Sequence, residues 1–123
     1  MAAKDSMRFI GRITTLALGA ALAAGCAGPK DPGERVWKKK CAACHGSDGA
    51  GRTRFAENRP FADLTDGKWR HGPGREPIRK LVADGDPRST MPPFEGTLTP
   101  DEIDAVVDHV LELAAAGEAG ARP

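Results

Sequence analysis

Five consecutive residues, Cys41-Ala42-Ala43-Cys44-His45, constrain this chain more than any other segment. Residues three apart on a helix lie on the same face, so the two thiols point the same way. Thiols placed like this can add to the two vinyl groups on one edge of a porphyrin, and the adjacent imidazole can reach the iron. The spacing C-x-x-C-H is the attachment pattern of a c-type haem. The sequence therefore predicts one covalently bound haem c on Cys41 and Cys44, with His45 as the proximal iron ligand.

Two other uses of a C-x-x-C pair need features that this sequence does not show. A thioredoxin-like C-x-x-C needs neighbouring strands, and no strand pattern is evident. A structural zinc site needs further ligands, and the sequence contains no second C-x-x-C and no H-x-x-x-H. A disulfide between Cys41 and Cys44 remains an alternative if the protein is exported.

The N-terminal residues 1–25 have the pattern of a signal peptide. Basic residues come first, and residues 13–24 then form an uncharged stretch that is too short to span a bilayer, which needs roughly 20 apolar residues. Small residues directly before Cys26 resemble a bacterial lipoprotein signal, which predicts a lipidated Cys26 as the mature N-terminus. Ordinary signal-peptidase cleavage nearby, or a buried N-terminal helix, are the alternatives. We expect a periplasmic protein, anchored by lipid to a membrane through a linker at 26–32.

Large apolar side chains are scarce. Leu, Ile, Val and Phe together number 21 of 123 residues, of which 15 follow the signal peptide. Such a proportion approaches that of disordered chains, although the net charge of +1 gives no repulsion to keep the chain open. The length allows one domain and excludes a multidomain enzyme or a polytopic membrane protein. A buried haem would complete the small core, so we expect the haem-free chain to be largely unfolded.

Three downstream residues could supply the second axial ligand of the iron: His71, Met91 and His109. Met91 lies in Thr-Met-Pro-Pro, where the prolines stiffen the loop and hold the thioether in place. We therefore expect Met91 to be the distal ligand. His71 as a second imidazole ligand, or Met91 as a plain core residue, are the alternatives.

The remaining pattern predicts an all-α domain with helices at about 31–44, 76–84 and from Thr99 onward. Thr99 and Glu102 form a capping box, and apolar residues then recur at helical spacing. Gly117 is expected to end this helix. We assign residues 33–115 to the haem domain and 116–123 to a loose tail.

The mature chain resembles the class I monohaem cytochromes c of the small bacterial type. Gly33, Trp37 and Cys41 follow that family's four-residue spacing ahead of the haem motif, and residues 63–72 resemble its propionate-side loop. The resemblance implies about three main helices and loops wrapped around the haem. It also implies that Trp69 hydrogen-bonds a haem propionate and that Arg70 neutralises it.

Two further expectations concern contacts around the haem motif. The carbonyl of Pro60 is expected to accept the Nδ1 hydrogen of His45 and so fix its ring. Many relatives carry an aromatic residue where His109 stands, so Trp37 is expected to pack on aliphatic side chains instead.

An electron carrier is the function that fits these features, and we do not expect an enzyme. The alternative is a haem-based gas sensor with a labile Met91. A peroxidase fits less well, because peroxidases usually have a second haem and this sequence contains one C-x-x-C-H.

Charge is distributed unevenly along the chain. Residues 30–80 carry 13 basic and 7 acidic residues, whereas residues 81–123 carry 2 basic and 9 acidic residues. Basic residues beside the haem motif, among them Lys38, Lys39 and Lys40, suggest steering of an acidic redox partner, with a solvated surface as the alternative. We expect membrane-bound respiratory complexes or a dehydrogenase as partners, and no nucleic acid.

Overall fold

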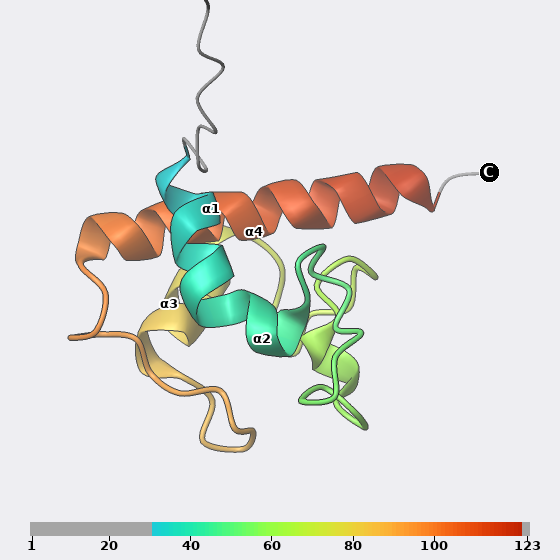
Figure 1. Cartoon of the computed structure of the whole chain (residues 1–123), viewed down its shortest axis with the longest axis horizontal. Helices are drawn as coiled ribbons and strands as arrows, with labels where there is room; N and C mark the ends of the chain where they lie inside the picture. Colours follow the sequence, from blue (N-terminus) through green and yellow to red (C-terminus); the bar gives the residue numbers. More distant parts are fainter. Residues whose placement is uncertain (1–30, 122–123) are drawn as a thin grey trace, which may run out of the picture.

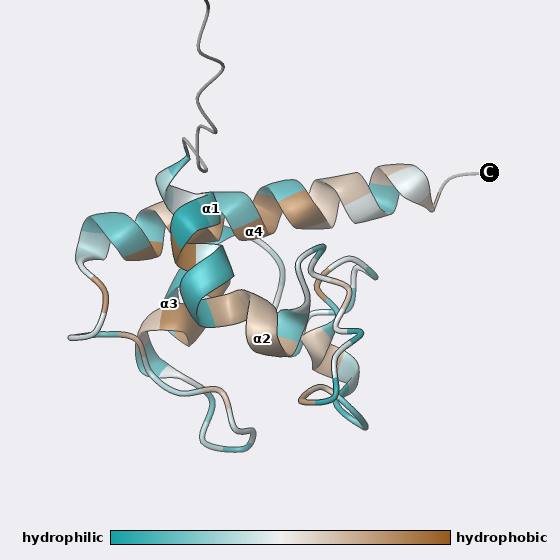
Figure 2. Ribbon diagram, in the orientation of Figure 1, coloured by the Kyte–Doolittle hydropathy of each residue, from teal (hydrophilic) through white to brown (hydrophobic). Residues whose placement is uncertain are grey.

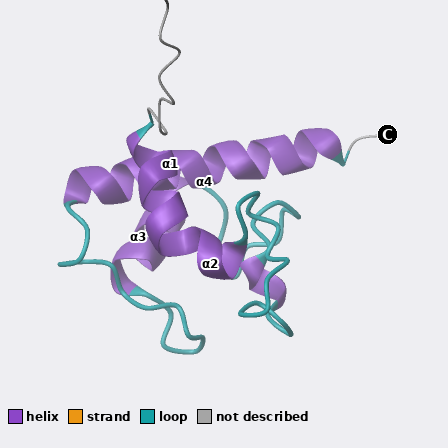
Figure 3. Cartoon of the chain, in the orientation of Figure 1, coloured by secondary structure: helices purple, strands orange, loops and turns teal. Residues whose placement is uncertain are grey.

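A computed structural model describes residues 31–121. This part of the chain is helical and contains no strand, as Figure 3 shows, apart from the isolated bridges Asp86–Met91 and Glu95–Leu98. The all-α prediction is therefore confirmed. The predictions for the signal peptide, for Cys26 and for most of the linker lie outside the described residues. The elements in chain order are α1 (Pro32–Val36), η1 (Trp37–Cys41), α2 (Ala42–His45), η2 (Pro60–Ala62), α3 (Arg75–Asp84) and α4 (Pro100–Gly120).

The first three elements form one continuous helical segment. The Asp31 carboxylate accepts the backbone N–H groups of Gly33 and Glu34, and Pro32 takes the first turn, where its missing N–H costs nothing. The middle part, η1, is a π-helix, a form that often marks functional sites in helices. It ends at Cys41, so the widened turn directly precedes the C-x-x-C-H motif. The segment stops at Gly46, whose φ of 84° favours glycine.

Helices α1 and α4 cross in close contact, as Figure 1 shows. A Cβ atom added at Gly33 would lie 2.9 Å from the carbonyl carbon of Ala105 and would overlap its oxygen. The absence of a side chain at Gly33 therefore allows the two backbones to touch.

Helix α4 supplies the largest share of the core, four of the ten residues of the buried cluster. Its capping box is present, with Thr99 accepting from the Glu102 N–H and the Glu102 carboxylate accepting from the Thr99 N–H. Its buried residues pack with α1, η1 and α3, and Figure 2 shows brown, hydrophobic segments on α3 and α4. This cluster consists of Val36, Trp37, Ile78, Val82, Phe94, Leu98, Ile103, Val106, Val107 and Val110. No helix within residues 31–121 has both the length and the apolar character to cross a membrane.

The end of α4 differs from the sequence prediction. The helix continues to Gly120, so the loose tail predicted from residue 116 is wrong for 116–120. Gly117 does not end the helix. A Cβ atom there would lie 2.6 Å from the Thr65 carbonyl oxygen, so this glycine lets the loop around Thr65 pack directly on α4.

The contact between the first and last helices also differs. Trp37 is 2% exposed, and its ring centroid lies 5.6 Å from that of His109 on α4. The prediction that Trp37 would lack a ring partner on α4 is therefore wrong. His109 supplies a planar ring at that position, and its side chain is 14% exposed.

Candidate haem site

A cavity of about 580 Å³ opens between the first helical segment, the loops around η2 and the segment that follows α3. That volume lies within the range of roughly 300–1,000 Å³ typical of small-molecule and cofactor sites. Both cysteines, His45 and Met91 line it, and core residues of α3 and α4 form its apolar floor. The fold therefore brings residues 41–45 and residue 91, far apart in sequence, to one cavity.

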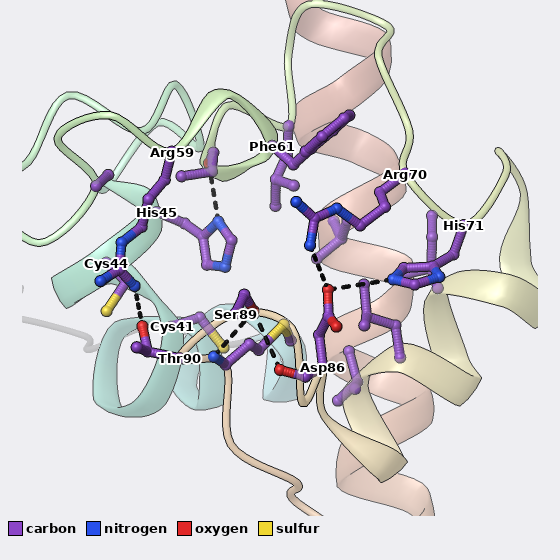
Figure 4. Close-up of a pocket in the computed structure, with 18 of the residues that line it drawn as sticks. Cys41, Cys44, His45, Arg59, Phe61, Arg70, His71, Asp86, Ser89 and Thr90 are labelled. Atoms are coloured by element: carbon purple, nitrogen blue, oxygen red, sulfur yellow. Dashed lines mark hydrogen bonds and ion pairs between the residues drawn. The ribbon is translucent and has the colours of Figure 1, made fainter.

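The ring of His45 is held from one side. Its Nδ1 lies 2.8 Å from the carbonyl oxygen of Ala62; a carbonyl oxygen can only accept, so Nδ1 carries the proton and donates it. Figure 4 marks this hydrogen bond of the His45 ring with a dashed line. The remaining ring nitrogen, Nε2, then has its lone pair free for a metal. Burial lowers the pKa of His45, and the Ala62 hydrogen bond opposes this shift, so the imidazole is neutral at physiological pH.

The acceptor of this hydrogen bond is not the one expected from sequence. The sequence predicted the Pro60 carbonyl as the acceptor, and this prediction is wrong because the acceptor is the carbonyl of Ala62. Pro60 begins the short 3₁₀ turn η2, and the turn carries the next two residues inward so that Ala62 presents its carbonyl to the ring.

The two cysteines lie on the same helical segment and are not joined to each other. Cys44 is exposed, whereas Cys41 is half-buried and packs against the core. Burial, together with the nearby Cys44, raises the pKa of the Cys41 thiol to about 11. Both sulfur atoms belong to residues that line the cavity, which agrees with the spacing needed to bind one porphyrin edge.

Met91 lies on a short segment whose backbone is held by hydrogen bonds. Its carbonyl accepts the Asp86 N–H at 3.1 Å, and its own N–H donates to the Ser89 hydroxyl at 3.2 Å. Gly85 permits this arrangement, because a Cβ atom there would lie 2.6 Å from the Pro93 nitrogen and its φ is 71°. Residues 86–91, which we call the methionine segment, are thus pressed against the end of α3.

The other two candidate distal ligands lie differently. His109 contacts Trp37 and is not among the residues that line the cavity. His71 does line the cavity, but its Nε2 lies 3.3 Å from the Asp86 carboxylate. Of the three candidates, Met91 and His71 therefore line the cavity, and the imidazole of His71 already contacts the Asp86 carboxylate.

Trp69 and Arg70, expected at the propionate side, both line the cavity. The Arg70 guanidinium has a protein partner, because Nη1 lies 2.9 Å from Asp86. It also lies over the Phe61 ring, 4.7 Å from the centroid. Arg70 keeps further N–H donors, since a guanidinium has five. The propionate roles of Trp69 and Arg70 remain predictions.

Sequence reasoning missed two features of this site. One is Asp86, a buried carboxylate that binds Arg70 and His71 together. The other is a hydrogen bond from Arg59 to the Thr90 hydroxyl, which joins the loop before η2 to the methionine segment. The available signals were the adjacent basic residues Arg70 and His71 and the Asp that follows Gly85. Nothing in the spacing of these residues indicates that their side chains meet.

The residues present fit a covalently bound haem. They comprise two thiols three residues apart, a neutral imidazole with Nε2 unengaged, a thioether from a separate segment, and a cavity with an apolar floor. These are the groups that haem c attachment and axial ligation require.

Comparisons with known proteins point the same way. Residues 28–110 match the family described as cytochrome c oxidase, cbb3-type, subunit III. The chain is 34% identical over 93 residues to the cbb3-type cytochrome c oxidase subunit CcoP of Rubrivivax gelatinosus, covering 71% of this chain and 28% of that subunit. It is 33% identical over 86 residues to cytochrome c6 of Leptolyngbya boryana, covering 69% of this chain and 93% of that protein. The chain spans less than a third of the length of the oxidase subunits that it matches.

Solved structures show the same similarity. The c-type cytochrome KustC0563 is 31% identical, with a TM-score of 0.57 over 66% of this chain and 95% of that one. A chain of the Kuenenia stuttgartiensis reducing HAO-like protein complex Kustc0457/Kustc0458 is 28% identical, with a TM-score of 0.62 over 78% of this chain and 46% of that one.

Proposed function

The chain belongs to the cytochrome c family, and we propose that it carries single electrons on one haem c bound through Cys41, Cys44, His45 and Met91. The observation that carries this proposal is the meeting of His45 and Met91 at one cavity whose wall also holds both cysteines. Family membership supports haem c as the cofactor, and the cavity supports these four residues as its ligands.

The haem supplies reversible one-electron chemistry at iron, and the chain supplies binding and surroundings. The Ala62 carbonyl holds the His45 ring in one orientation and keeps its proton on Nδ1. The apolar floor from α3 and α4 would shield the inner side of a bound haem from water, which favours a tightly ligated centre over one open to reagents. A carrier needs such a closed centre, whereas an enzyme needs a vacant coordination position.

Charge around the cavity supports an acidic partner. The charged residues on its wall are basic with one exception, Asp86, which is paired with Arg70. The basic residues are Lys40, Arg59, Lys68, Arg70 and Arg88. Of the three consecutive lysines, Lys40 alone lines the cavity, and Lys38 pairs with Glu34 at 2.6 Å on the same helical segment. A positive rim attracts a partner with negative charge and raises the rate of encounter.

We further propose that the protein works in the periplasm, tethered by lipid on Cys26, and relays electrons between respiratory complexes. The signal-like residues 1–25 support export, and the similarity to oxidase subunits supports a respiratory role. A tether would raise the effective concentration of the domain near membrane-bound partners.

The visible spectrum of the oxidised protein tests the ligand assignment. We expect a low-spin ferric spectrum with the weak red band of methionine–iron ligation. Met91→Ala is expected to abolish that band and open the site, whereas His71→Ala is expected to keep it. A wild-type protein with a high-spin spectrum, or one that binds carbon monoxide as readily as Met91→Ala, would instead favour the gas-sensor alternative.

A further inference from the structure

Asp86 has an unusual position for a carboxylate. It is 6% exposed, and within residues 31–121 it is the one charged side chain that is buried. Its Oδ2 accepts from Arg70 Nη1 at 2.9 Å and lies 3.3 Å from His71 Nε2, and its Oδ1 accepts the Arg88 N–H at 3.0 Å. Buried carboxylates are retained only with such partners, because an unpaired one is very costly. Figure 4 shows Asp86 between the two basic side chains.

The backbone of the same residue belongs to the methionine segment. The Asp86 N–H donates to the Met91 carbonyl at 3.1 Å, and the Asp86 carbonyl accepts the Ser89 N–H at 3.0 Å. The Ser89 hydroxyl in turn accepts the Met91 N–H at 3.2 Å. Asp86 thus holds Met91 through its backbone and the segment around Arg70 through its side chain.

The two segments that Asp86 joins flank α3. Arg70 and His71 precede the helix, which begins at Arg75, and the methionine segment follows its last residue, Asp84. The carboxylate therefore joins the segment before α3 to the segment after it. Without this attachment, the exposed part of the methionine segment would be held by its own turn and by the Arg59–Thr90 contact at the cavity rim.

We propose that Asp86 is a positioning residue that locks the methionine segment to the Arg70–His71 segment and so limits how often Met91 leaves the cavity. This inference rests on the proposed function, because it takes Met91 as the distal ligand. It assigns to Arg70 a role in ligand retention that acts through Asp86, in addition to its expected place beside a propionate.

Two measurements on the haem-loaded protein test this inference, with Asp86→Asn as the variant. Asparagine keeps the shape of the side chain and an acceptor for the Arg88 N–H, but it removes the charge that holds Arg70. The matched control is Asp84→Asn, because Asp84 is exposed, pairs with Lys80 and lies off the haem cavity.

The first measurement is the affinity of imidazole for the ferric protein, followed in the visible spectrum. Imidazole competes with Met91 for the iron, so its apparent affinity rises with the fraction of molecules in which Met91 is displaced. We expect Asp86→Asn to bind imidazole about tenfold more tightly, the effect on an equilibrium of losing roughly one charge-assisted hydrogen bond. Asp84→Asn is expected to match the wild type.

The second measurement is amide hydrogen exchange of the ferrous protein by NMR, which reports opening of the segment whichever ligand the iron has. The amides of residue 86, Ser89 and Met91 are expected to exchange faster in Asp86→Asn, while that of Ile103 at the start of α4 is expected to keep its wild-type rate. Unchanged exchange in the methionine segment would overturn the inference. Faster exchange together with unchanged imidazole affinity would support the locking role and would contradict Met91 as the distal ligand, so the two failures are distinguishable.

A second variant covers the case in which Asp86→Asn does not fold. Arg70→Gln removes one partner and leaves the buried carboxylate its bonds to His71 and to the Arg88 N–H. It is expected to change imidazole affinity and exchange in the same direction as Asp86→Asn, by a smaller factor. An Arg70→Gln protein identical to the wild type in both measurements would also overturn the inference.

Discussion

The crossing of α1 and α4 at Gly33 gives a prediction whose size follows from the structure. In Gly33→Ala, the new methyl group would lie 2.9 Å from the Ala105 carbonyl carbon and would overlap its oxygen. These are backbone atoms of a long helix, so they cannot rotate away, and the two helices must separate. Overpacking of this kind costs about 1–3 kcal/mol, and overlap with two backbone atoms puts this site toward the upper end.

A second effect opposes this cost. Alanine is about 1 kcal/mol better than glycine within a helix, so part of the loss is recovered. We therefore expect Gly33→Ala to lower the free energy of unfolding of the ferric, haem-loaded protein by about 1–2 kcal/mol. Guanidinium unfolding followed by far-UV circular dichroism measures this difference.

Gly120→Ala is the control for the Gly33 experiment. Gly120 also belongs to a helix, but a Cβ atom there would meet nothing within 4 Å. Gly120 is the last residue of α4, so its substitution should leave the free energy of unfolding unchanged or raise it by at most about 1 kcal/mol. If Gly33→Ala proves as stable as Gly120→Ala, the reasoning about the helix crossing is refuted.

Three further predictions follow from the core, the α4 cap and the rim of the cavity. Replacing Cys41 and Cys44 by serine prevents haem attachment, and the chain should then lose most of its helical circular dichroism; full helicity with a cooperative melt would show that the core folds without haem. Thr99→Ala removes the α4 cap and should cost about 1 kcal/mol in urea unfolding, against little change for the exposed Thr97→Ala. Oxidation of the ferrous protein by the anion ferricyanide should slow as salt is added, because the basic rim attracts it; an opposite salt dependence would show that the negative α4 dominates.

The helices were predictable from sequence because their signals are local. Pro32 suits the first turn of α1, Thr99 caps the start of α4, and Gly85 ends α3 with a positive φ. Gly117 was misread, because a glycine that ends a helix and one that admits a neighbouring backbone look alike in sequence. The contact with Thr65 that distinguishes them joins residues 52 positions apart.

The haem motif was predictable for the same reason, since Cys41, Cys44 and His45 act from one helical segment. The contacts around the motif were harder to predict from the sequence. The carbonyl that holds His45 comes from Ala62 because of the turn that Pro60 begins, and a sequence does not state how far a loop turns before a carbonyl points inward. Asp86 was missed because its role depends on two loops brought together by α3, and no repeat or spacing encodes such a meeting.

Intact mass spectrometry of the exported mature protein, under denaturing conditions, tests the central claim most directly. Covalent attachment through Cys41 and Cys44 predicts that one haem stays on the chain after unfolding, on a protein that begins at Cys26 and carries lipid. Lipid and haem add separate masses, so the spectrum reports the anchor and the cofactor independently. A chain whose mass contains no haem after unfolding would contradict the account.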